Sequence, residues 1–159
     1  MIPKLFDYIG FFGPIILSFI TVLKLYKQQP YLIGYFIFLG GNVIVNHVLK
    51  HIILEERPSG GRSLINEPYN GMHKYGMPSS HAQSAFYSMT YLYLTKQDPT
   101  TLLVELFICA LTVYQRWNYR QHTAEQLGIG AIIGIIMGFL AEYMTKQYVF
   151  SRTLETVKP

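Results

Sequence analysis

Charged side chains are scarce in this sequence of 159 residues, because only 14% are Asp, Glu, Lys or Arg, against about a quarter in soluble domains. So few charges cannot cover a globular surface, and half of the residues are apolar. A single cysteine, Cys109, excludes an internal disulfide. The basic residues are scattered and form no stripe for a nucleic acid. The composition therefore predicts one integral-membrane domain over residues 1–159, and it argues against a disordered chain, a disulfide scaffold and a nucleic-acid partner.

Five apolar runs divide the chain, and each predicts a membrane-spanning helix, which needs about 20 mostly apolar residues. The runs are Ile9–Tyr26, Tyr31–Leu49, Ser80–Thr95, Thr101–Trp117 and Thr123–Met144. The third and fourth runs are shorter and carry polar residues, which we expect to face other helices. The sequence thus predicts an all-α membrane bundle of about five transmembrane helices with a site at one membrane interface.

Polar residues gather at the helix ends on one predicted membrane face. If five spans alternate, the end of the second run, the start of the third and the junction of the fourth and fifth share one side. The residues there are Lys50, Arg57, Ser79, Ser80, His81, Arg116 and His122. Charged groups close to lipid are costly and mark functional sites. This set of cations, histidines and hydroxyls predicts a site for an anion.

The chemistry that needs these residue types together is phosphoryl transfer. A transferring phosphoryl group carries charge on its equatorial oxygens and needs cations and N–H donors aimed at them. Arg57 and Arg116 offer planar forks, and Lys50 offers a point charge. Ser79 and Ser80 stand at a helix N-terminus, which favours an anion. One neutral histidine can attack phosphorus while a protonated one donates to the leaving oxygen, so we expect no metal ion and no other cofactor.

The order and spacing of these residues resemble the type-2 phosphatidic acid phosphatase superfamily. The three motifs of that superfamily are matched by Lys50-x6-Arg57-Pro58, Pro78-Ser79-x-His81 and Arg116-x5-His122, within residues 50–126. The resemblance implies that His122 is the nucleophile, which forms a phosphohistidine, and that His81 is the general acid. It also implies a phosphate cradle made of Lys50, Arg57, Ser79, Ser80 and Arg116.

Three positions depart from the usual superfamily pattern, which has a glycine between the serine and histidine of the second motif, a serine before the third-motif arginine and an aspartate four residues after the nucleophile. Ser80, Gln115 and Gln126 stand there instead. Gln126 shares a helix face with His122, and its carbonyl oxygen can accept the Nδ1–H of His122 and leave Nε2 free to attack. Glu125 is an alternative partner for that histidine.

The same departures resemble the dolichyl-diphosphatase branch of the superfamily, whose members carry Ser-Ser in the second motif and Gln in the third. The matching segments here are residues 75–83 and His122-Thr123-x-x-Gln126. The branch implies removal of the terminal phosphate from a polyprenyl diphosphate, in the endoplasmic reticulum membrane with the site facing the lumen. With Lys50, Arg57 and Arg116 set aside, four basic residues remain on the side of the site and six on the other, in agreement with that orientation.

We therefore expect an integral-membrane lipid phosphatase whose partners are a polyprenyl diphosphate, or a related phospholipid, and membrane lipid. Two alternatives stay open. One is a phosphatase of phosphatidate or another lipid monophosphate. The other, favoured by Gln115 and Gln126, is an inactive membrane protein, structural or scramblase-like, that retains the motifs.

Three glycines at four-residue spacing, Gly130, Gly134 and Gly138, lie on one face of the last predicted span. Small residues on one face let two helices approach closely in a membrane. The spacing predicts packing against another span of the same chain, with a homodimer seam as the alternative.

Overall fold

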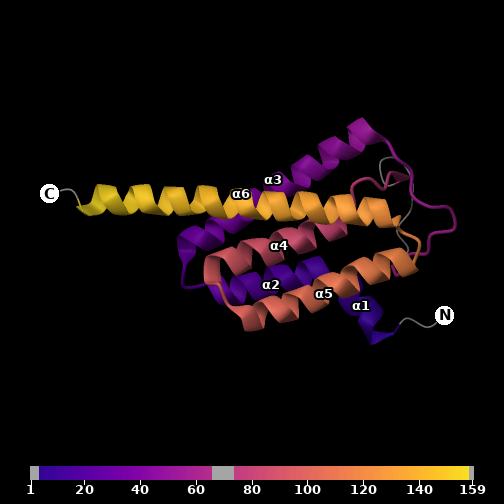
Figure 1. Cartoon of the computed structure of the whole chain (residues 1–159), viewed down its shortest axis with the longest axis horizontal. Helices are drawn as coiled ribbons and strands as arrows, with labels where there is room; N and C mark the ends of the chain where they lie inside the picture. The colour runs from indigo at the N-terminus through magenta and orange to yellow at the C-terminus, as the bar shows by residue number, and fades with distance from the viewer. Residues whose placement is uncertain (1–3, 66–73, 158–159) are drawn as a thin grey trace.

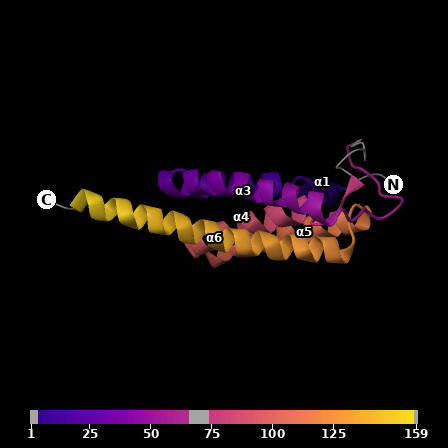
Figure 2. The same ribbon diagram turned by 90° about the horizontal axis from the view of Figure 1, so that it is seen from above.

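A computed structural model describes residues 4–65 and 74–157, which form six α-helices and no β-strand. The helices are α1 (Leu5–Phe11), α2 (Gly13–Leu25), α3 (Gln29–Ile53), α4 (Ser80–Lys96), α5 (Pro99–Asn118) and α6 (Ala124–Val157). The long helices form an elongated bundle, and the C-terminal part of α6 extends beyond the others (Figure 1; Figure 2). The predicted all-α bundle is confirmed.

Two helices, α3 and α6, are long and apolar enough to cross a membrane, and the bent pair of α1 and α2 makes a third if it counts as one span. By the same measure of length and hydropathy, α4 and α5 do not qualify. The helix α4 can carry polar residues because it contacts α2, α3, α5 and α6, so that other helices surround its side chains. Its polar residues do face other helices, as predicted, because Gln83 and Ser88 are fully buried.

The first predicted span is broken between α1 and α2, which are bent by 70° relative to each other. Phe12 separates the two helices, and Pro14 lies in the first turn of α2. Proline fits a first turn but clashes with the preceding turn inside a helix, so one continuous helix over Ile9–Tyr26 was a wrong prediction. As a result α1 packs against α5, where a side chain at Gly10 would collide with the carbonyl of Leu111.

The row of glycines on α6 packs closely against α4. A Cβ atom added to Gly130 would lie 2.6 Å from the carbonyl oxygen of Ser79, and Cβ atoms on Gly134 and Gly138 would also collide with atoms of α4. The predicted packing of these glycines against another helix of the chain is confirmed. A homodimer stays a prediction, and the glycine row already packs against α4 within one chain.

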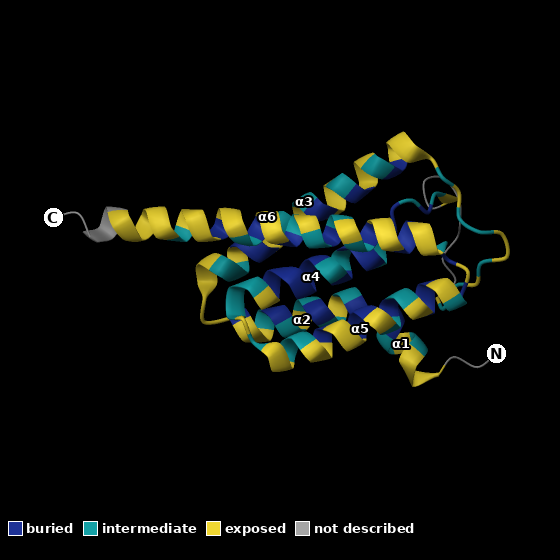
Figure 3. Ribbon diagram, viewed as in Figure 1, coloured by how far each residue is buried: buried dark blue, intermediate teal, exposed yellow. Residues whose placement is uncertain are grey.

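The outside of the bundle carries many large apolar side chains among the exposed residues (yellow in Figure 3). Examples more than half exposed are Phe19, Ile37, Phe107, Ile136 and Phe139. In water such a surface would be unfavourable, whereas lipid tails solvate it without cost. The exterior therefore fits a bundle embedded in a bilayer.

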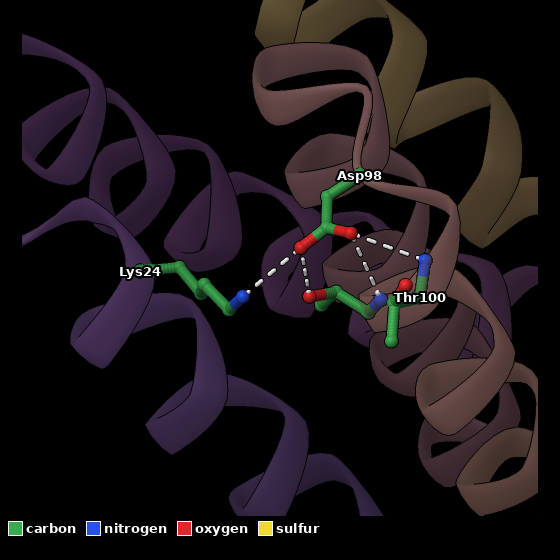
Figure 4. A network of polar contacts seen from close by, with 4 residues as sticks. Lys24, Asp98 and Thr100 are labelled. Carbon is green, nitrogen blue, oxygen red and sulfur yellow. Dashed lines mark hydrogen bonds and ion pairs between the residues drawn. The ribbon is translucent and has the colours of Figure 1, made fainter.

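Asp98 caps α5 at the end of the bundle where α4 turns into α5 (Figure 4). Its carboxylate accepts the N–H groups of Thr100 at 3.1 Å and Thr101 at 3.3 Å, the hydroxyl of Thr101 at 2.6 Å and the ammonium of Lys24 at 3.0 Å. The hydroxyl of Thr101, followed by Lys24, lowers the pKa of Asp98 below its usual range. The cap thus ties α2 to the turn between α4 and α5.

Candidate active site

The residues predicted to bind an anion come together at one end of the bundle, where α3 and α5 end and α4 and α6 begin (Figure 1). Lys50 and Arg116 lie in the last turns of α3 and α5 and are only 8% and 3% exposed. The same three cations, Lys50, Arg57 and Arg116, act electrostatically on both His81 and His122. The structure therefore gathers two histidines and three cations in one site, while their chemical roles remain predictions.

Two serines open α4 within this site. Ser79 is the N-cap residue and is fully buried, and its side-chain oxygen accepts the backbone N–H of Ala82 at 3.4 Å. Its own N–H donates to the backbone carbonyl of Gln126 at 3.0 Å, which joins the start of α4 to the start of α6. Ser80 follows in the first turn and is half-buried. The N-terminus of α4 thus lies where an anion would benefit from the helix dipole.

His122 is held by the side-chain amide of Gln126. The amide oxygen lies 3.2 Å from Nδ1 of His122 and accepts the N–H of Thr123 at 3.3 Å. The amide nitrogen donates to the carboxylate of Glu55 at 2.7 Å and to the backbone carbonyl of Glu56 at 3.0 Å. Because a backbone N–H only donates and a backbone carbonyl only accepts, the amide has a single orientation. Nδ1 of His122 must then carry the proton, and Nε2 holds the lone pair.

The lone pair on Nε2 of His122 faces Arg57. The guanidinium donates to Nε2 at 2.8 Å and to the backbone carbonyl of Gln121 at 2.9 Å. The contact between Gln126 and His122 that the sequence predicted is present, whereas Glu125, the alternative partner, is exposed. An anion that attracts the guanidinium would leave Nε2 free to attack.

The buried imidazole of His122 is held in its neutral form. Burial, followed by the charges of Arg57, Arg116 and Lys50, lowers the pKa of His122 well below its ordinary value of 6.5. A neutral imidazole keeps the lone pair that a nucleophile needs.

We expect the acid limb of kcat/KM to lie well below pH 6.5. The lowered pKa means that His122 stays unprotonated as the pH falls through 6.5, so activity is lost only at still lower pH. The measurement is phosphate release from a lipid diphosphate between about pH 4 and pH 9, because kcat/KM reports the groups of the free enzyme. An acid limb centred at or above pH 6.5 would contradict a neutral nucleophile.

His81 is covered by α1, a contact that was not predicted from the sequence. The ring of His81 lies 5.6 Å from the ring of Phe11 and hydrogen-bonds the carbonyl of Phe11. The guanidinium carbon of Arg116 lies 5.2 Å from the centre of the same ring, which is a cation–π contact. One phenylalanine thus orients a histidine and shields a cation. In the sequence it is one aromatic residue within an apolar run, so no pattern singles it out.

Buried amides brace the turn that leads into α4. The amide nitrogen of Asn46 donates to the carbonyl of Pro78 at 3.2 Å and to the side-chain oxygen of Gln83 at 2.7 Å. Gln83 in turn donates to the backbone and side-chain oxygens of Asn42, both at 2.9 Å. These bonds fix α3 to the start of α4. Asn42 and Asn46 were not predicted as site residues, although their four-residue spacing inside an apolar run is a usable signal.

Three cavities adjoin this end of the bundle. One of about 280 Å³ is lined by Arg57, Lys74 and Arg120 among other loop residues. A second, of about 360 Å³, lies between α4 and the junction of α1 with α2, and its lining combines His81 with apolar residues such as Phe12. A third, of about 570 Å³, lies between α5 and α6 and is apolar. The site therefore borders both polar and apolar space.

Comparison with known proteins gives a consistent result. The PAP2 superfamily model matches residues 31–149. Dolichyldiphosphatase 1 of Dictyostelium discoideum is 34% identical over 146 residues, which cover 82% of this chain and 61% of that protein. Dolichyldiphosphatase 1 of Homo sapiens is 31% identical over 153 residues, which cover 84% and 60%. Lipid phosphate phosphatase epsilon 2, chloroplastic, of Arabidopsis thaliana is 33% identical over 107 residues, which cover 62% and 34%. No solved structure matches.

The chain spans about three fifths of the length of the dolichyldiphosphatases that it matches. The matched region contains all three motifs, from Lys50 to His122, and extends over helices α3 to α6. The resemblance predicted from motif spacing is confirmed, and the chain belongs to the PAP2 superfamily.

Proposed function

We propose that this chain is an integral-membrane lipid phosphatase that removes the terminal phosphate of a polyprenyl diphosphate of the dolichyl type. The observation that carries the proposal is the neutral His122, whose Nε2 lone pair faces Arg57 and whose Nδ1–H is held by Gln126. Such an imidazole can attack a phosphorus atom. Similarity to proteins named dolichyldiphosphatase supports this choice of substrate.

In the first step the terminal phosphate binds among Lys50, Arg57 and Arg116, which neutralise its equatorial oxygens. Arg57 turns its N–H from His122 to a phosphate oxygen. The lone pair of Nε2 then forms a bond to phosphorus, and the bond from phosphorus to the bridging oxygen breaks. His81 gives its proton to that oxygen, and the lipid monophosphate leaves. The diphosphate itself supplies the negative charge that keeps a proton on His81.

In the second step water attacks the phosphohistidine. The water oxygen bonds to phosphorus while the bond to Nε2 breaks, and His81 accepts a proton from the water. Inorganic phosphate leaves, and His122 regains its lone pair. Gln126 holds the proton on Nδ1 throughout, so the same nitrogen attacks in each cycle.

The leaving oxygen belongs to the phosphate that carries the lipid tail, so the tail lies on the side of the group that protonates that oxygen. His81 and Ser80 line the cavity between α4 and the junction of α1 with α2. Its apolar lining residues come from α1, α2 and their junction. We assign the first isoprenoid units to this cavity. The larger cavity between α5 and α6 contains neither histidine in its lining, so it is the less suitable of the two.

We also propose that the site faces the lumen of the endoplasmic reticulum. The support is the branch resemblance and the count of basic residues outside the site, which is four on the side of the site and six on the opposite side once Lys50, Arg57 and Arg116 are set aside. The source of the substrate would then be a reaction that releases a polyprenyl diphosphate on that side.

Detergent-solubilised protein is expected to release phosphate from a polyprenyl diphosphate at least about tenfold faster, in kcat/KM, than from phosphatidate. A monophosphate leaves part of the cationic site unpaired, which a site built for a diphosphate penalises. The assay measures inorganic phosphate with EDTA present, because the proposed steps use only side chains of the chain.

A preference for phosphatidate would favour the lipid monophosphate phosphatase. No release from either substrate by folded protein would favour the inactive membrane protein. Activity that EDTA removes and a divalent metal restores would contradict the mechanism.

A further inference from the structure

Glu55 lies directly behind the amide that holds His122. Its carboxylate accepts the amide N–H of Gln126 at 2.7 Å. The position of Glu55 is fixed by its backbone, because α3 ends at Ile53 with Leu54 as a left-handed C-cap, and the carbonyl of Glu55 accepts the N–H of Gly76 at 2.7 Å. The fold therefore places this half-buried carboxylate beside the side-chain amide of Gln126.

Gly76 supplies the space that this arrangement needs. A Cβ atom at Gly76 would collide with the side-chain amide of Gln126, with its amide carbon at 2.7 Å and its nitrogen at 2.8 Å. Gly76 thus contacts both the backbone of Glu55 and the side-chain amide of Gln126. Backbone pairing of Glu56 with Tyr75 continues this contact by one residue.

The carboxylate affects His122 in two ways. First, it gives one amide N–H of Gln126 a charged acceptor, which is stronger than a neutral one, and so keeps the amide oxygen turned toward Nδ1. Second, positive charge develops on the imidazole when Nε2 attacks phosphorus, and a chain of hydrogen bonds that ends in a carboxylate stabilises that charge.

We propose that Glu55 is a positioning residue for the nucleophile, acting on His122 through Gln126. The relay runs from the carboxylate to the amide nitrogen, and from the amide oxygen to Nδ1. It supplies from the end of α3 the negative charge that Gln126 lacks. This inference rests on the proposed function, in which His122 attacks phosphorus.

Replacing Glu55 with alanine is expected to lower kcat by about tenfold, as loss of a partner that orients an active group does, with KM changed by less than about threefold. Glu125→Ala is the matched control, because it removes an exposed carboxylate one residue from Gln126. It should leave both constants unchanged. Glu55→Gln, which keeps an acceptor but loses the charge, should fall between wild type and Glu55→Ala.

A double variant with Gln126 distinguishes a positioning role of Glu55 from a general effect of Glu55 on the stability of the protein. If Glu55 acts through the amide, the double variant Glu55→Ala, Gln126→Ala should be no slower than Gln126→Ala alone. Effects that multiply in the double variant would overturn the proposal, as would a loss in Glu55→Ala that appears only in KM. Thermal unfolding of each variant in detergent shows whether the protein compared is folded.

A second readout does not depend on turnover. In the ¹⁵N spectrum of the histidine-labelled protein, the His122 signal, identified by its loss in His122→Ala, should report a proton on Nδ1 alone. Glu55→Ala should shift it toward a mixture of the two tautomers. An unchanged signal would overturn the role of Glu55 even if the wild-type protein released no phosphate, in which case the proposed function alone would have failed.

Discussion

His122→Ala is expected to reduce phosphate release from a polyprenyl diphosphate by at least about a thousandfold, because it removes the atom that bonds to phosphorus. The second histidine of the site, His81, cannot take its place, since it hydrogen-bonds the carbonyl of Phe11 and lies at the start of a different helix. The measurement is phosphate release under substrate saturation. It should be accompanied by acid-quench trapping of the phosphoenzyme, which the variant should not form.

The matched control is His51→Ala. His51 is an exposed histidine on α3 whose Nδ1 contacts the carbonyl of His47 at 2.8 Å, so its loss should leave turnover unchanged. Turnover of His122→Ala within about tenfold of wild type would rule out His122 as the nucleophile. That result would also favour the alternative of an inactive membrane protein that retains the motifs.

Arg57→Lys is expected to lower kcat by about a hundredfold, which is the effect of removing one donor from a charged transition state. Lysine keeps the positive charge but lacks the planar guanidinium, one nitrogen of which, Nη1, now donates both to Nε2 of His122 and to the carbonyl of Gln121. A point charge on a flexible stem cannot hold the loop and meet two phosphate oxygens at once. The loss should therefore appear mainly in kcat, where the equatorial oxygens carry most charge.

Arg152→Lys serves as the control for this substitution. Arg152 stacks on Tyr148 in the part of α6 that lies far from the site (Figure 1), and its replacement should have no effect on kcat. If Arg57→Lys retained full kcat, the cation would act only as a point charge, and the bidentate contact inferred for phosphate would be wrong.

The polar site could be predicted from the sequence because its residues stand at the ends of apolar runs. An apolar run shows where a helix ends, and Ser80 is both the predicted and the observed first residue of α4. Helix ends on one membrane face then bring Lys50, Arg116 and His122 together whatever the details of packing. The contact between His122 and Gln126 followed from helical spacing alone.

The remainder depends on tertiary contacts that leave no local pattern. The bend at Phe12 brings Phe11 over Arg116 and His81, although Pro14 alone could mark only the start of a helix. Glu55 looks in the sequence like a solvated charge beside a second glutamate. Its role becomes visible only when pairing with the segment of Gly76 places it behind the amide. The polar end of α6 likewise continues as helix beyond the last apolar run.

The bend between α1 and α2 has a practical consequence for work with this protein. Because α1 packs against α5 and its last residue, Phe11, contacts His81 and Arg116, the N-terminal helix stands at the end of the bundle that holds the site. The helix α6, in contrast, carries Val157 to the far end of the molecule (Figure 1). An affinity handle or a fluorophore attached beyond Val157 leaves the phosphate entrance clear, so a protein immobilised by that end presents its reacting groups to the solution.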